Sequence, residues 1–420
     1  MLTDHAVAVR DGKIEAVLRA ADARSRYADY EALELADHVL IPGLVNAHTH
    51  AAMTLMRGLA DDLPLMPWLE EHLWPAEKQH VSADFVRDGT LLACAEMLRG
   101  GITCFNDMYF FPEAALEASL EAGMRSSHGI IVIEFPSAYA ADAADYLRKG
   151  LELRDRYRDE SLASFCLAPQ APYTVSDASF KQIATLAAEL DLPVHVHVHE
   201  TEHEIQASLA EHGVRPLERL RRLNLVAPNL IAVHAVHLTP EEIALLARHG
   251  SSVAHCPSSN LKLASGFAPV ARLAAAGVNL ALGTDGAASN NRLDLLEETR
   301  LAALVAKAVA GDPQAMPAHA ALRAATLGGA QALGLADRIG SITTGKAADL
   351  AAVALRGPEL APCFDPVSHL VYAAGREHVT HVWVAGEPRV AEGKLLGDAF
   401  SRLENRTSLW QNALGSLAEH

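Results

Sequence analysis

Short apolar runs alternate with longer segments of helical period through the middle of the chain. Eight runs of strand length occupy residues 41–50, 103–108, 127–133, 165–172, 193–200, 231–238, 252–257 and 279–285. Between them, apolar residues recur at helical spacing in 83–99, 112–122, 140–157, 177–190, 240–248 and 269–275. Ser82 and Asp177 stand where helix N-caps belong. Eight alternations predict an α/β fold and favour a (β/α)8 TIM-type barrel over a doubly wound open sheet.

The two ends of the chain carry strand patterns instead. Residues 6–17 (AVAVRDGKIEAV) predict two strands around Asp11-Gly12, a dipeptide that favours hairpin turns. Further strands are predicted at 348–353, 379–384 and 388–390. We therefore expect a small β-sandwich domain built from both ends (residues 1–42 and 343–398) beside a barrel domain (residues 43–342). Residues 399–420 predict a helical tail.

Composition and charge exclude several kinds of partner. The 420 residues are 50% hydrophobic, which is too apolar for a disordered chain. The 35 basic and 52 acidic residues give a net charge of −17, which disfavours nucleic-acid binding through a basic face. No apolar run reaches membrane-span length, and the first ten residues lack the pattern of a secretory signal. The five scattered cysteines form no CxxC, which predicts a cytoplasmic protein without disulfides or a thiolate metal site.

Histidines gather at the ends of the predicted strands, where barrels of this kind build their active sites. His48 and His50 form HTH at the end of the first run, and residues i and i+2 of a strand share a face. Two imidazoles could therefore coordinate one metal ion at the C-terminal end of the barrel.

The fifth run ends in HVHVHE, which contains His195, His197, His199 and Glu200. Three buried imidazoles on one face would each need hydrogen-bond partners, so a purely structural role explains this run poorly. Spacing alone does not choose between His197 and His199 as a ligand. Glu200 faces the other way in a regular strand, so the chain must turn near residues 198–200 to bring it into the site.

Two later runs end in further candidates. His234 and His237 lie in AVHAVHL, and Asp285 lies in LGTDG. A single histidine there can equally be a satisfied core residue, and Asp285 can equally be an N-cap or a turn residue. Together, however, three histidines and one aspartate on strands one, five and eight fit an N/O metal site. A structural zinc is disfavoured because such sites are closed and rich in cysteine.

An ordered set of motifs in this sequence resembles that of a known family. PGLVNAHTH, HVHVHE, AVHAVHL, HCPSSNLKLASG and LGTDG occur in order, followed by GSITTGKAADLAAV near the C-terminus. This set resembles the amidohydrolase superfamily and, within it, the methylthioadenosine/S-adenosylhomocysteine deaminases. The resemblance covers nearly the whole chain. Members of this family usually have another strand or two before the segment matching residues 4–17, so we expect either a late annotated start or a truncated small domain.

The resemblance implies a deformed barrel with one divalent metal ion per chain, usually Zn2+. Carried over position by position, it implies the ligands His48, His50, His197 and Asp285. It also makes Glu200 the proton shuttle and His234 a catalytic histidine, whereas His237 matches no required position. The run SFCLAPQAPYT lacks the lysine that bridges two metals in binuclear relatives, which supports a single ion.

The residue types suggest a mechanism for this site. A bound divalent ion lowers the pKa of water from about 15.7 towards 7. We expect Asp285 to accept the proton of the attacking water and Glu200 to protonate the ring nitrogen beside the amino-bearing carbon. His234 would steady the new oxygen while the amino group leaves as ammonia. Such acid–base help is typically worth about 100- to 10,000-fold.

The resemblance also implies substrate contacts. In LPLMPWLEEHLWPAEK, it makes Trp68 an apolar wall near the 5′ substituent and Glu77 the acceptor for the ribose hydroxyls, with Ser289 near the purine. An aromatic face suits a thioether and a carboxylate suits a diol. The alternative for the first pair is a packed loop with a solvated acid. Gln170 stands where the family usually has a histidine (QAPYT for HAPYT), and it cannot titrate.

One departure bears on substrate choice. Relatives that accept S-adenosylhomocysteine hold its carboxylate with arginines downstream of the third strand, but this chain has none between Arg125 and Arg148. Arg148 is the candidate, although it lies far along the predicted helix. We therefore expect 5′-methylthioadenosine as the preferred substrate, with S-adenosylhomocysteine and adenosine weaker. The alternatives are deamination of a free base or a triazine and, from another class, a non-enzymatic scaffold. The resemblance also implies a homo-oligomer (dimer or tetramer) and a small-molecule nucleoside as the partner.

Overall fold

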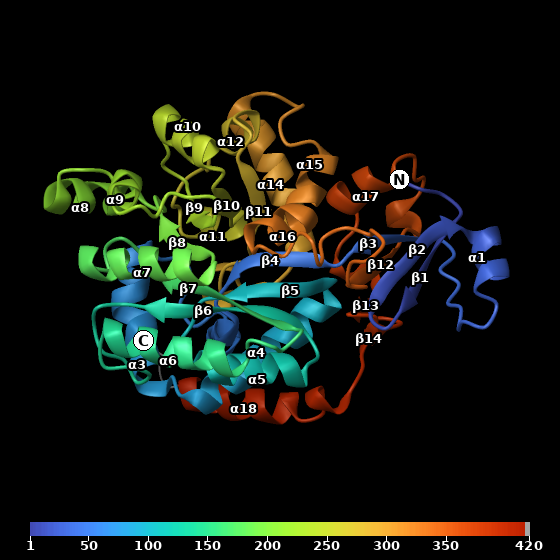
Figure 1. Cartoon of the computed structure of the whole chain (residues 1–420), viewed down its shortest axis with the longest axis horizontal. Helices are drawn as coiled ribbons and strands as arrows, with labels where there is room; N and C mark the ends of the chain where they lie inside the picture. The colour runs from blue at the N-terminus through green and yellow to red at the C-terminus, as the bar shows by residue number, and fades with distance from the viewer. Residues whose placement is uncertain (416–420) are drawn as a thin grey trace.

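The computed structural model describes residues 1–415, and a sheet of eight parallel strands forms its centre (Figure 1). The strands neighbour one another in chain order from β4 to β11. Their bounds are β4 (Leu44–Thr49), β5 (Ile102–Asp107), β6 (Arg125–Val132), β7 (Ala163–Pro169), β8 (Val194–Val198), β9 (Leu230–His234), β10 (Ser252–His255) and β11 (Asn279–Leu282). Each overlaps one predicted run, so the predicted barrel is confirmed.

The first and last strands of this sheet meet through individual hydrogen bonds. The Asp285 backbone N–H donates to the His48 carbonyl over 3.1 Å. Beside it, the Thr284 N–H donates to the Asn46 side-chain oxygen over 3.0 Å, and the Asn46 amide donates to the Thr284 hydroxyl over 2.7 Å. The Asn46 side chain thus supplies hydrogen bonds between the ends of the first and last strands, where backbone groups supply them elsewhere in the sheet.

Helices surround the barrel, and all six predicted helices are present. The helices between and after the strands are α4 (Ala83–Arg99), α5 (Pro112–Glu121), α6 (Ala143–Arg156), α7 (Asp177–Leu190), α8 (Glu202–His212), α9 (Pro216–Arg222), α10 (Pro240–His249), α11 (Pro257–Lys262), α12 (Val270–Ala275), α13 (Ala287–Asn290), α14 (Leu295–Ala310), α15 (Ala318–Arg323), the π-helical η3 (Ala324–Gly328) and α16 (Gly329–Ala332). Three shorter elements cover the barrel mouth: α2 (Leu65–Pro67), the π-helical η2 (Trp68–Leu73) and α3 (Trp74–His80).

The predicted N-caps have different outcomes. Ser82 caps α4 by accepting from the Phe85 N–H, as predicted. The prediction for Asp177 was wrong, because Ser176 has the extended cap conformation and accepts from the Ser179 N–H over 3.2 Å. Asp177 is the first helical residue, and its carboxylate accepts from Arg219 instead.

Strands from both ends of the chain form the small β part at the right of Figure 1. A five-stranded antiparallel sheet has the order β15-β14-β13-β12-β3, and the hairpin β1-β2 is a separate sheet. The bounds are β1 (His5–Arg10), β2 (Lys13–Arg19), β3 (His38–Pro42), β12 (Leu350–Ala354), β13 (Val379–Val384), β14 (Glu387–Ala391) and β15 (Lys394–Leu395), with α1 (Ala20–Arg26) and α17 (Pro366–Tyr372) alongside.

The hairpin packs on the larger sheet. Ile14 is buried with Leu350 and Ala348, and Val7 and Val9 contact this cluster. Asp11 and Gly12 both have positive φ (50° and 75°), as a type I′ hairpin turn requires. Two sheets packed in this way fit the predicted sandwich. The exact division into ranges 1–42, 43–342 and 343–398 stays a prediction.

The predicted run 41–50 was wrong as a single strand. Ile41 and Pro42 belong to β3, which pairs with β12, whereas Leu44 begins β4 of the barrel. The change of sheet occurs at Gly43, where a Cβ would lie 2.0 Å from the Thr103 hydroxyl. Only glycine allows the chain to pass this close to the neighbouring strand.

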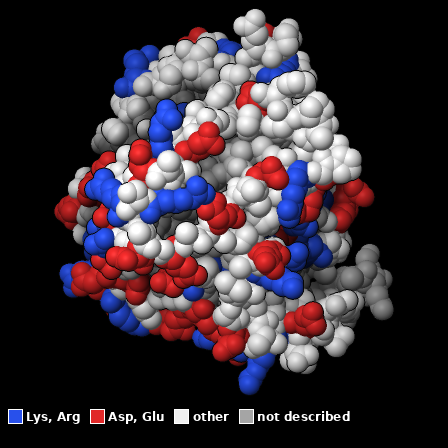
Figure 2. Space-filling view, turned by 90° about the vertical axis from the view of Figure 1, so that its right-hand side faces the viewer, with Lys and Arg blue, Asp and Glu red and all other residues white. Residues whose placement is uncertain are grey.

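The C-terminal segment forms α18 (Leu403–Leu414), inside the predicted tail of residues 399–420, of which 416–420 lie outside the described residues. Arg406 and Trp410 of α18 both donate to Asp88 of α4, over 2.6 and 2.9 Å. In residues 1–415, no helix has both the length and the apolar content needed to cross a membrane. On the face shown in Figure 2, acidic and basic side chains are interspersed, without a continuous basic surface.

Candidate metal and substrate site

The predicted ligands meet where the barrel strands end. His48 and His50 come from the end of β4, His197 from β8, His234 from β9 and Asp285 from the turn after β11. His234 and Asp285 have φ of 66° and 58°, a left-handed backbone that non-glycine residues rarely adopt. Such strain is typical of functional sites, where it turns a side chain away from the strand direction.

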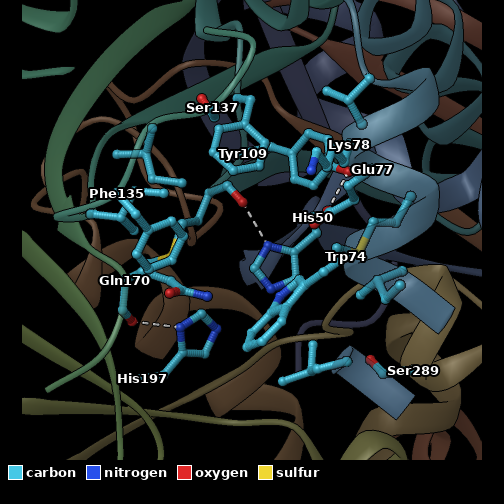
Figure 3. A pocket seen from close by; sticks show the side chains of 18 of the residues that line it. His50, Trp74, Glu77, Lys78, Tyr109, Phe135, Ser137, Gln170, His197 and Ser289 are labelled. Carbon is cyan, nitrogen blue, oxygen red and sulfur yellow. Dashed lines mark hydrogen bonds between the residues drawn. The ribbon is translucent and has the colours of Figure 1, made fainter. Parts of the chain in front are cut away.

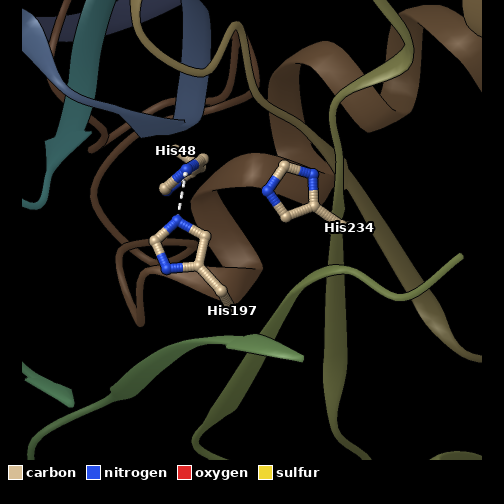
Figure 4. Close-up of side chains that lie close together, drawn as sticks. All are labelled: His48, His197 and His234. Atoms are coloured by element: carbon tan, nitrogen blue, oxygen red, sulfur yellow. Dashed lines mark hydrogen bonds between the residues drawn. The ribbon is translucent and has the colours of Figure 1, made fainter. Parts of the chain in front are cut away.

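Nitrogen and oxygen atoms converge on one point in this cluster. The Asp285 Oδ1 lies 3.2 Å from the His48 Nε2 and 3.3 Å from the His50 Nε2. The His197 Nε2 lies 3.2 Å from the His48 Nε2, and His234 stands beside this pair (Figure 4). Two sets of possible ligand atoms therefore share His48: one with His197 and His234, the other with His50 and Asp285.

Hydrogen bonds fix the orientation of two of these rings. The His50 Nδ1 donates to the Met108 carbonyl over 2.6 Å, and the His197 Nδ1 donates to the Gln170 carbonyl over 2.7 Å (Figure 3). The opposite nitrogen of each ring, Nε2, then points at the cluster. Such a second contact fixes the tautomer of a metal-binding histidine.

The chemistry of this donor set fits a divalent cation. Burial lowers the pKa of His48 to about 4 and that of His197 well below its usual value, so both rings stay neutral. Burial alone would raise the pKa of Asp285, but its hydrogen bonds to His48 and His50 hold it well below the usual range. The Nε2 atoms of His48, His50 and His197 thus meet an Asp285 carboxylate that stays ionised, an arrangement that a cation among them would stabilise. Imidazole and carboxylate are also ligands that zinc accepts.

The three histidines of the HVHVHE segment have different surroundings. The His195 Nε2 lies 2.9 Å from the His48 Nδ1, behind the cluster. His199 points away, because its Nε2 accepts from the Leu217 N–H over 3.0 Å. Spacing left the choice between His197 and His199 open, and only His197 reaches the cluster.

A turn after β8 brings Glu200 into the site, as the sequence required. The strand ends at Val198 and His199 has a φ of 57°. The Glu204 carboxylate holds this turn by accepting from the N–H groups of His199 (3.0 Å) and Glu200 (2.9 Å). Burial raises the pKa of Glu200, which favours a carboxyl group able to give and take a proton.

His234 lies beside Glu200. Its Nε2 is 3.7 Å from the Glu200 carboxylate, and its Nδ1 is 2.8 Å from the side-chain oxygen of Asn260. Sequence reasoning missed Asn260 and its neighbour Ser259, which donates to the Asp285 Oδ2 over 2.6 Å. Both lie in HCPSSN, a segment that contributed to the resemblance but received no role.

A cavity of about 670 Å³ opens in front of the cluster. Among its lining residues are Glu200, His234 and Asp285 together with four predicted substrate contacts: Trp68, Glu77, Gln170 and Ser289. Its other walls are largely apolar, with Trp74, Tyr109, Phe110, Phe111, Ile131, Ile133 and Phe135 (Figure 3). The cavity thus offers an apolar chamber with a few polar groups, as small-molecule sites do.

Glu77 is held by a tyrosine that the sequence did not reveal. The Tyr109 hydroxyl donates to the Glu77 Oε1 over 2.7 Å. Burial raises the pKa of Glu77 to about 7, although the hydrogen bond from Tyr109 opposes this shift. Glu77 is therefore a half-buried acid at the cavity wall rather than a solvated surface group.

Arg148 does not join the other predicted residues. Its side chain is 56% exposed on α6 and pairs with Asp145 over 2.6 Å and with Glu152 over 2.9 Å. It lies outside the set of cavity-lining residues. The reason is its place along the helix, where it forms i,i+3 and i,i+4 ion pairs with its own neighbours.

Fold and site together define a (β/α)8 barrel protein. Beneath an apolar cavity it has a buried His–Asp cation cluster, that is, the side chains of His48, His50, His197 and Asp285 arranged to hold a cation. A family model described as the amidohydrolase family matches residues 39–389. The 5-methylthioadenosine/S-adenosylhomocysteine deaminase of Teredinibacter turnerae is 46% identical over 416 residues, which covers 99% of this chain and 94% of that protein. The chain belongs to the amidohydrolase family and, within it, to the 5-methylthioadenosine/S-adenosylhomocysteine deaminases.

Solved structures agree with this assignment. The crystal structure of an adenosine deaminase from Xanthomonas campestris with bound zinc has a TM-score of 0.96 and 51% identity. The match covers 99% of this chain and 94% of that one. Atrazine chlorohydrolase TrzN from Arthrobacter aurescens, complexed with zinc, has a TM-score of 0.90 at 26% identity, with coverage of 97% and 95%.

Proposed function

We propose that this protein hydrolytically deaminates an adenine nucleoside, preferably 5′-methylthioadenosine, to yield 5′-methylthioinosine and ammonia. The observation that carries the proposal is the pairing of a His–Asp cation cluster with a nucleoside-sized cavity walled by Trp68 and Glu77. The names of the T. turnerae and X. campestris relatives support the same reaction class.

His48, His50, His197 and Asp285 would hold one divalent ion in this proposal. The zinc in the X. campestris structure supports Zn2+ as that ion. When bound, the ion supplies a Lewis acid that lets water ionise near neutral pH.

The remaining steps fall to side chains. Asp285 accepts a proton from the attacking water, and Glu200 gives a proton to the ring nitrogen next to the amino-bearing carbon. This protonation draws electrons from that carbon, so the water oxygen adds there. His234, whose Nε2 lies within 3.7 Å of Glu200, steadies the new oxygen. Asp285 then passes the proton it accepted to the amino group, the new hydroxyl gives its proton to Glu200, the C–N bond breaks and ammonia leaves.

The cavity wall would recognise the rest of the nucleoside. The Glu77 carboxylate accepts hydrogen bonds from the two ribose hydroxyls, and Trp68 covers the 5′ thioether. Gln170 and Ser289 line the cavity on the purine side in this arrangement. The Gln170 Oε1 is buried without a hydrogen-bond partner among the described residues, so it is available to a donor of the substrate.

The preference for methylthioadenosine over S-adenosylhomocysteine follows from the charges around the cavity. Arg148 lies outside it, and Lys78 is the single Lys or Arg among the described lining residues. An ammonium group offers a carboxylate a point charge, whereas a guanidinium forms a bidentate pair. S-adenosylhomocysteine would therefore be accepted, but less well.

The alternative is deamination of a free base or a triazine at the same cluster. The likeness to atrazine chlorohydrolase supports the shared chemistry at 26% identity. Glu77 argues against it, because neither substrate has a diol for this half-buried carboxylate to bind. A non-enzymatic scaffold is disfavoured because the four predicted ligands meet in one cluster and Glu200 and His234 line the cavity beside it.

The test is ammonia release by the zinc-loaded protein with methylthioadenosine, S-adenosylhomocysteine, adenosine and guanine in parallel. We expect the highest kcat/KM with methylthioadenosine. Turnover of guanine alone would overturn the nucleoside assignment, and equal efficiency with the two thioethers would overturn the preference. A homodimer or tetramer stays a prediction that sedimentation of the full chain would test.

A further inference from the structure

The two oxygens of the Asp285 carboxylate have different neighbours. Oδ1 faces the Nε2 atoms of His48 and His50. Oδ2 accepts from two hydroxyls, that of Ser259 over 2.6 Å and that of Ser289 over 2.9 Å. Together with the Gly286 N–H, which donates to Oδ1 over 2.9 Å, the two serines therefore fix the rotation of the carboxylate.

These two serines belong to separate segments, and one buried carboxylate joins both. Ser259 lies in α11 and Ser289 in α13. The N–H of Ser258, next to Ser259, donates to the Glu298 Oε2 over 3.0 Å. The amide of Asn290, next to Ser289, donates to the Glu298 Oε1 over 2.9 Å. Each oxygen of Glu298 thus holds the neighbour of one serine.

Glu298 lies in α14 and is only 1% exposed. Within residues 1–415, it forms no ion pair with a Lys, Arg or His side chain. Holding this group without a cation is costly, as burial raises the pKa of Glu298 to about 8, and an apolar side chain of similar size would usually be no worse for stability. The presence of a glutamate at this position therefore indicates a role that needs two acceptor oxygens in fixed positions. Ser258 and Asn290 supply the two donors.

We propose that Glu298 is a positioning residue for Asp285, acting through Ser259 and Ser289. It sets the distance between α11 and α13, so that both hydroxyls reach the same carboxylate oxygen. The inference rests on the proposed function, in which Asp285 accepts the proton of the attacking water. Without Glu298, the two serines are no longer held in position. The Asp285 carboxylate can then rotate so that Oδ1 no longer faces His48 and His50. Turnover should fall more than substrate binding, because the ribose and thioether contacts lie on η2 and α3.

The test is a double-mutant cycle on the zinc-loaded full-length protein. It compares Glu298→Gln, the pair Ser259→Ala/Ser289→Ala, and the combination of all three. Glutamine keeps an acceptor for Ser258 but turns a donor towards the Asn290 amide. We expect Glu298→Gln to lower kcat for methylthioadenosine about 10-fold or more, with KM within about 3-fold. Added to the serine pair, it should lower kcat by less than about 2-fold, because the serines carry its effect.

A second readout does not depend on turnover. Zinc affinity, measured by competition with a chelator, should fall about 10- to 100-fold in Glu298→Gln, the scale for residues that orient a metal ligand. It should fall no further when the serine substitutions are added. The matched control is Glu297→Gln, which alters the neighbouring, partly exposed glutamate of the same helix, paired with Arg292. This control should leave kcat and zinc affinity unchanged.

The outcomes separate this inference from the proposed function. The positioning role would be overturned if Glu298→Gln lowered kcat as much in the serine double variant as in the wild type. It would also be overturned if Glu298→Gln behaved like Glu297→Gln. If the wild type does not deaminate methylthioadenosine but zinc affinity shows the coupling, the proposed function fails and the positioning role stands. Should Glu298→Gln not fold, a second cycle of Asn290→Ala with and without Ser289→Ala tests the Asn290–Ser289 half of the arrangement. Multiplying losses there would again reject the inference.

Discussion

Asn46 closes the barrel by pairing its side chain with Thr284. Its amide oxygen accepts from the Thr284 backbone and its amide nitrogen donates to the Thr284 hydroxyl, which in turn donates to the Asp285 carbonyl over 3.0 Å. A buried side chain thus joins the seam between the first and last strands to the backbone of a predicted metal ligand.

Substitution of Asn46 should therefore affect both stability and turnover. We expect Asn46→Ala to lower the free energy of unfolding by about 1–3 kcal/mol, the cost of leaving buried groups unpaired, and to lower kcat because Asp285 loses its backbone support. Asn106→Ala is the matched control, since Asn106 is equally buried and donates to the Ala47 carbonyl one strand away. Denaturant melts and kcat check this, and an equal fall of kcat in both variants would contradict it.

Removal of the proton-carrying group at position 200 should separate chemistry from metal binding. We expect Glu200→Gln to keep the zinc content of the wild type and to lose about 100- to 10,000-fold in kcat, because glutamine cannot exchange a proton. Glu202→Gln, on the exposed start of α8, serves as the control. Metal analysis and steady-state kinetics test the expectation, and near-normal turnover of Glu200→Gln would reject the assigned role.

The histidines of the HVHVHE segment allow a direct test of ligand choice. His197→Gln should lose zinc affinity by more than the roughly 10- to 100-fold expected for an outer contact. His199→Gln should retain zinc but unfold more easily, because the Leu217 N–H loses its acceptor. Chelator competition on both variants decides the matter, and the reverse pattern would show that the ligand set is misassigned.

Substrate affinity should depend on pH through Glu77. Burial raises its pKa to about 7, so the carboxylate is largely protonated below that value and ionised above it. Only the ionised form accepts from both ribose hydroxyls, so KM should fall as pH rises through about 7. Tyr109→Phe removes a hydrogen bond that lowers this pKa, so the transition should move to higher pH. An analogue without ribose hydroxyls is the control, and the same transition with that analogue would exclude Glu77 as its source.

Lys78 should discriminate between the two thioether substrates. Lys78→Met is expected to lower kcat/KM for S-adenosylhomocysteine about 2- to 5-fold, the scale of an exposed ion pair. Methylthioadenosine, which has no carboxylate, should change by less than about 2-fold. Lys181→Met, on the exposed face of α7, controls for loss of surface charge. An unchanged ratio between the two substrates would show that the carboxylate does not meet Lys78.

The barrel could be predicted from the sequence because its signal is local and repeated. Each of the eight apolar runs contains a buried parallel strand, and such strands are continuous apolar segments. Position along a strand also predicted that His48, His50 and Asp285 would meet at one end. The single run 41–50 was misleading, since the change of sheet at Gly43 depends on the approach of Thr103, a residue sixty positions away.

The surroundings of the ligands could not be predicted in the same way. Ser259, Asn260, Tyr109 and Glu298 reach the site by folds of the chain that no spacing rule encodes. Whether His197 or His199 enters the site depends on a left-handed turn held by the Glu204 carboxylate. Arg148 shows the opposite case: a suitable residue type whose helix places it among its own acidic neighbours.

The pairing of β3 with β12 constrains how the chain folds. Residues 38–42 leave the ribosome long before residues 350–354 exist, so β3 must wait for its partner while the whole barrel is synthesised between them. Contacts between segments so distant in sequence close slowly, and an unpaired strand edge invites association with another chain. Sealing of the small sheet should therefore be the last event in folding and the step at which newly made chains are most prone to aggregate.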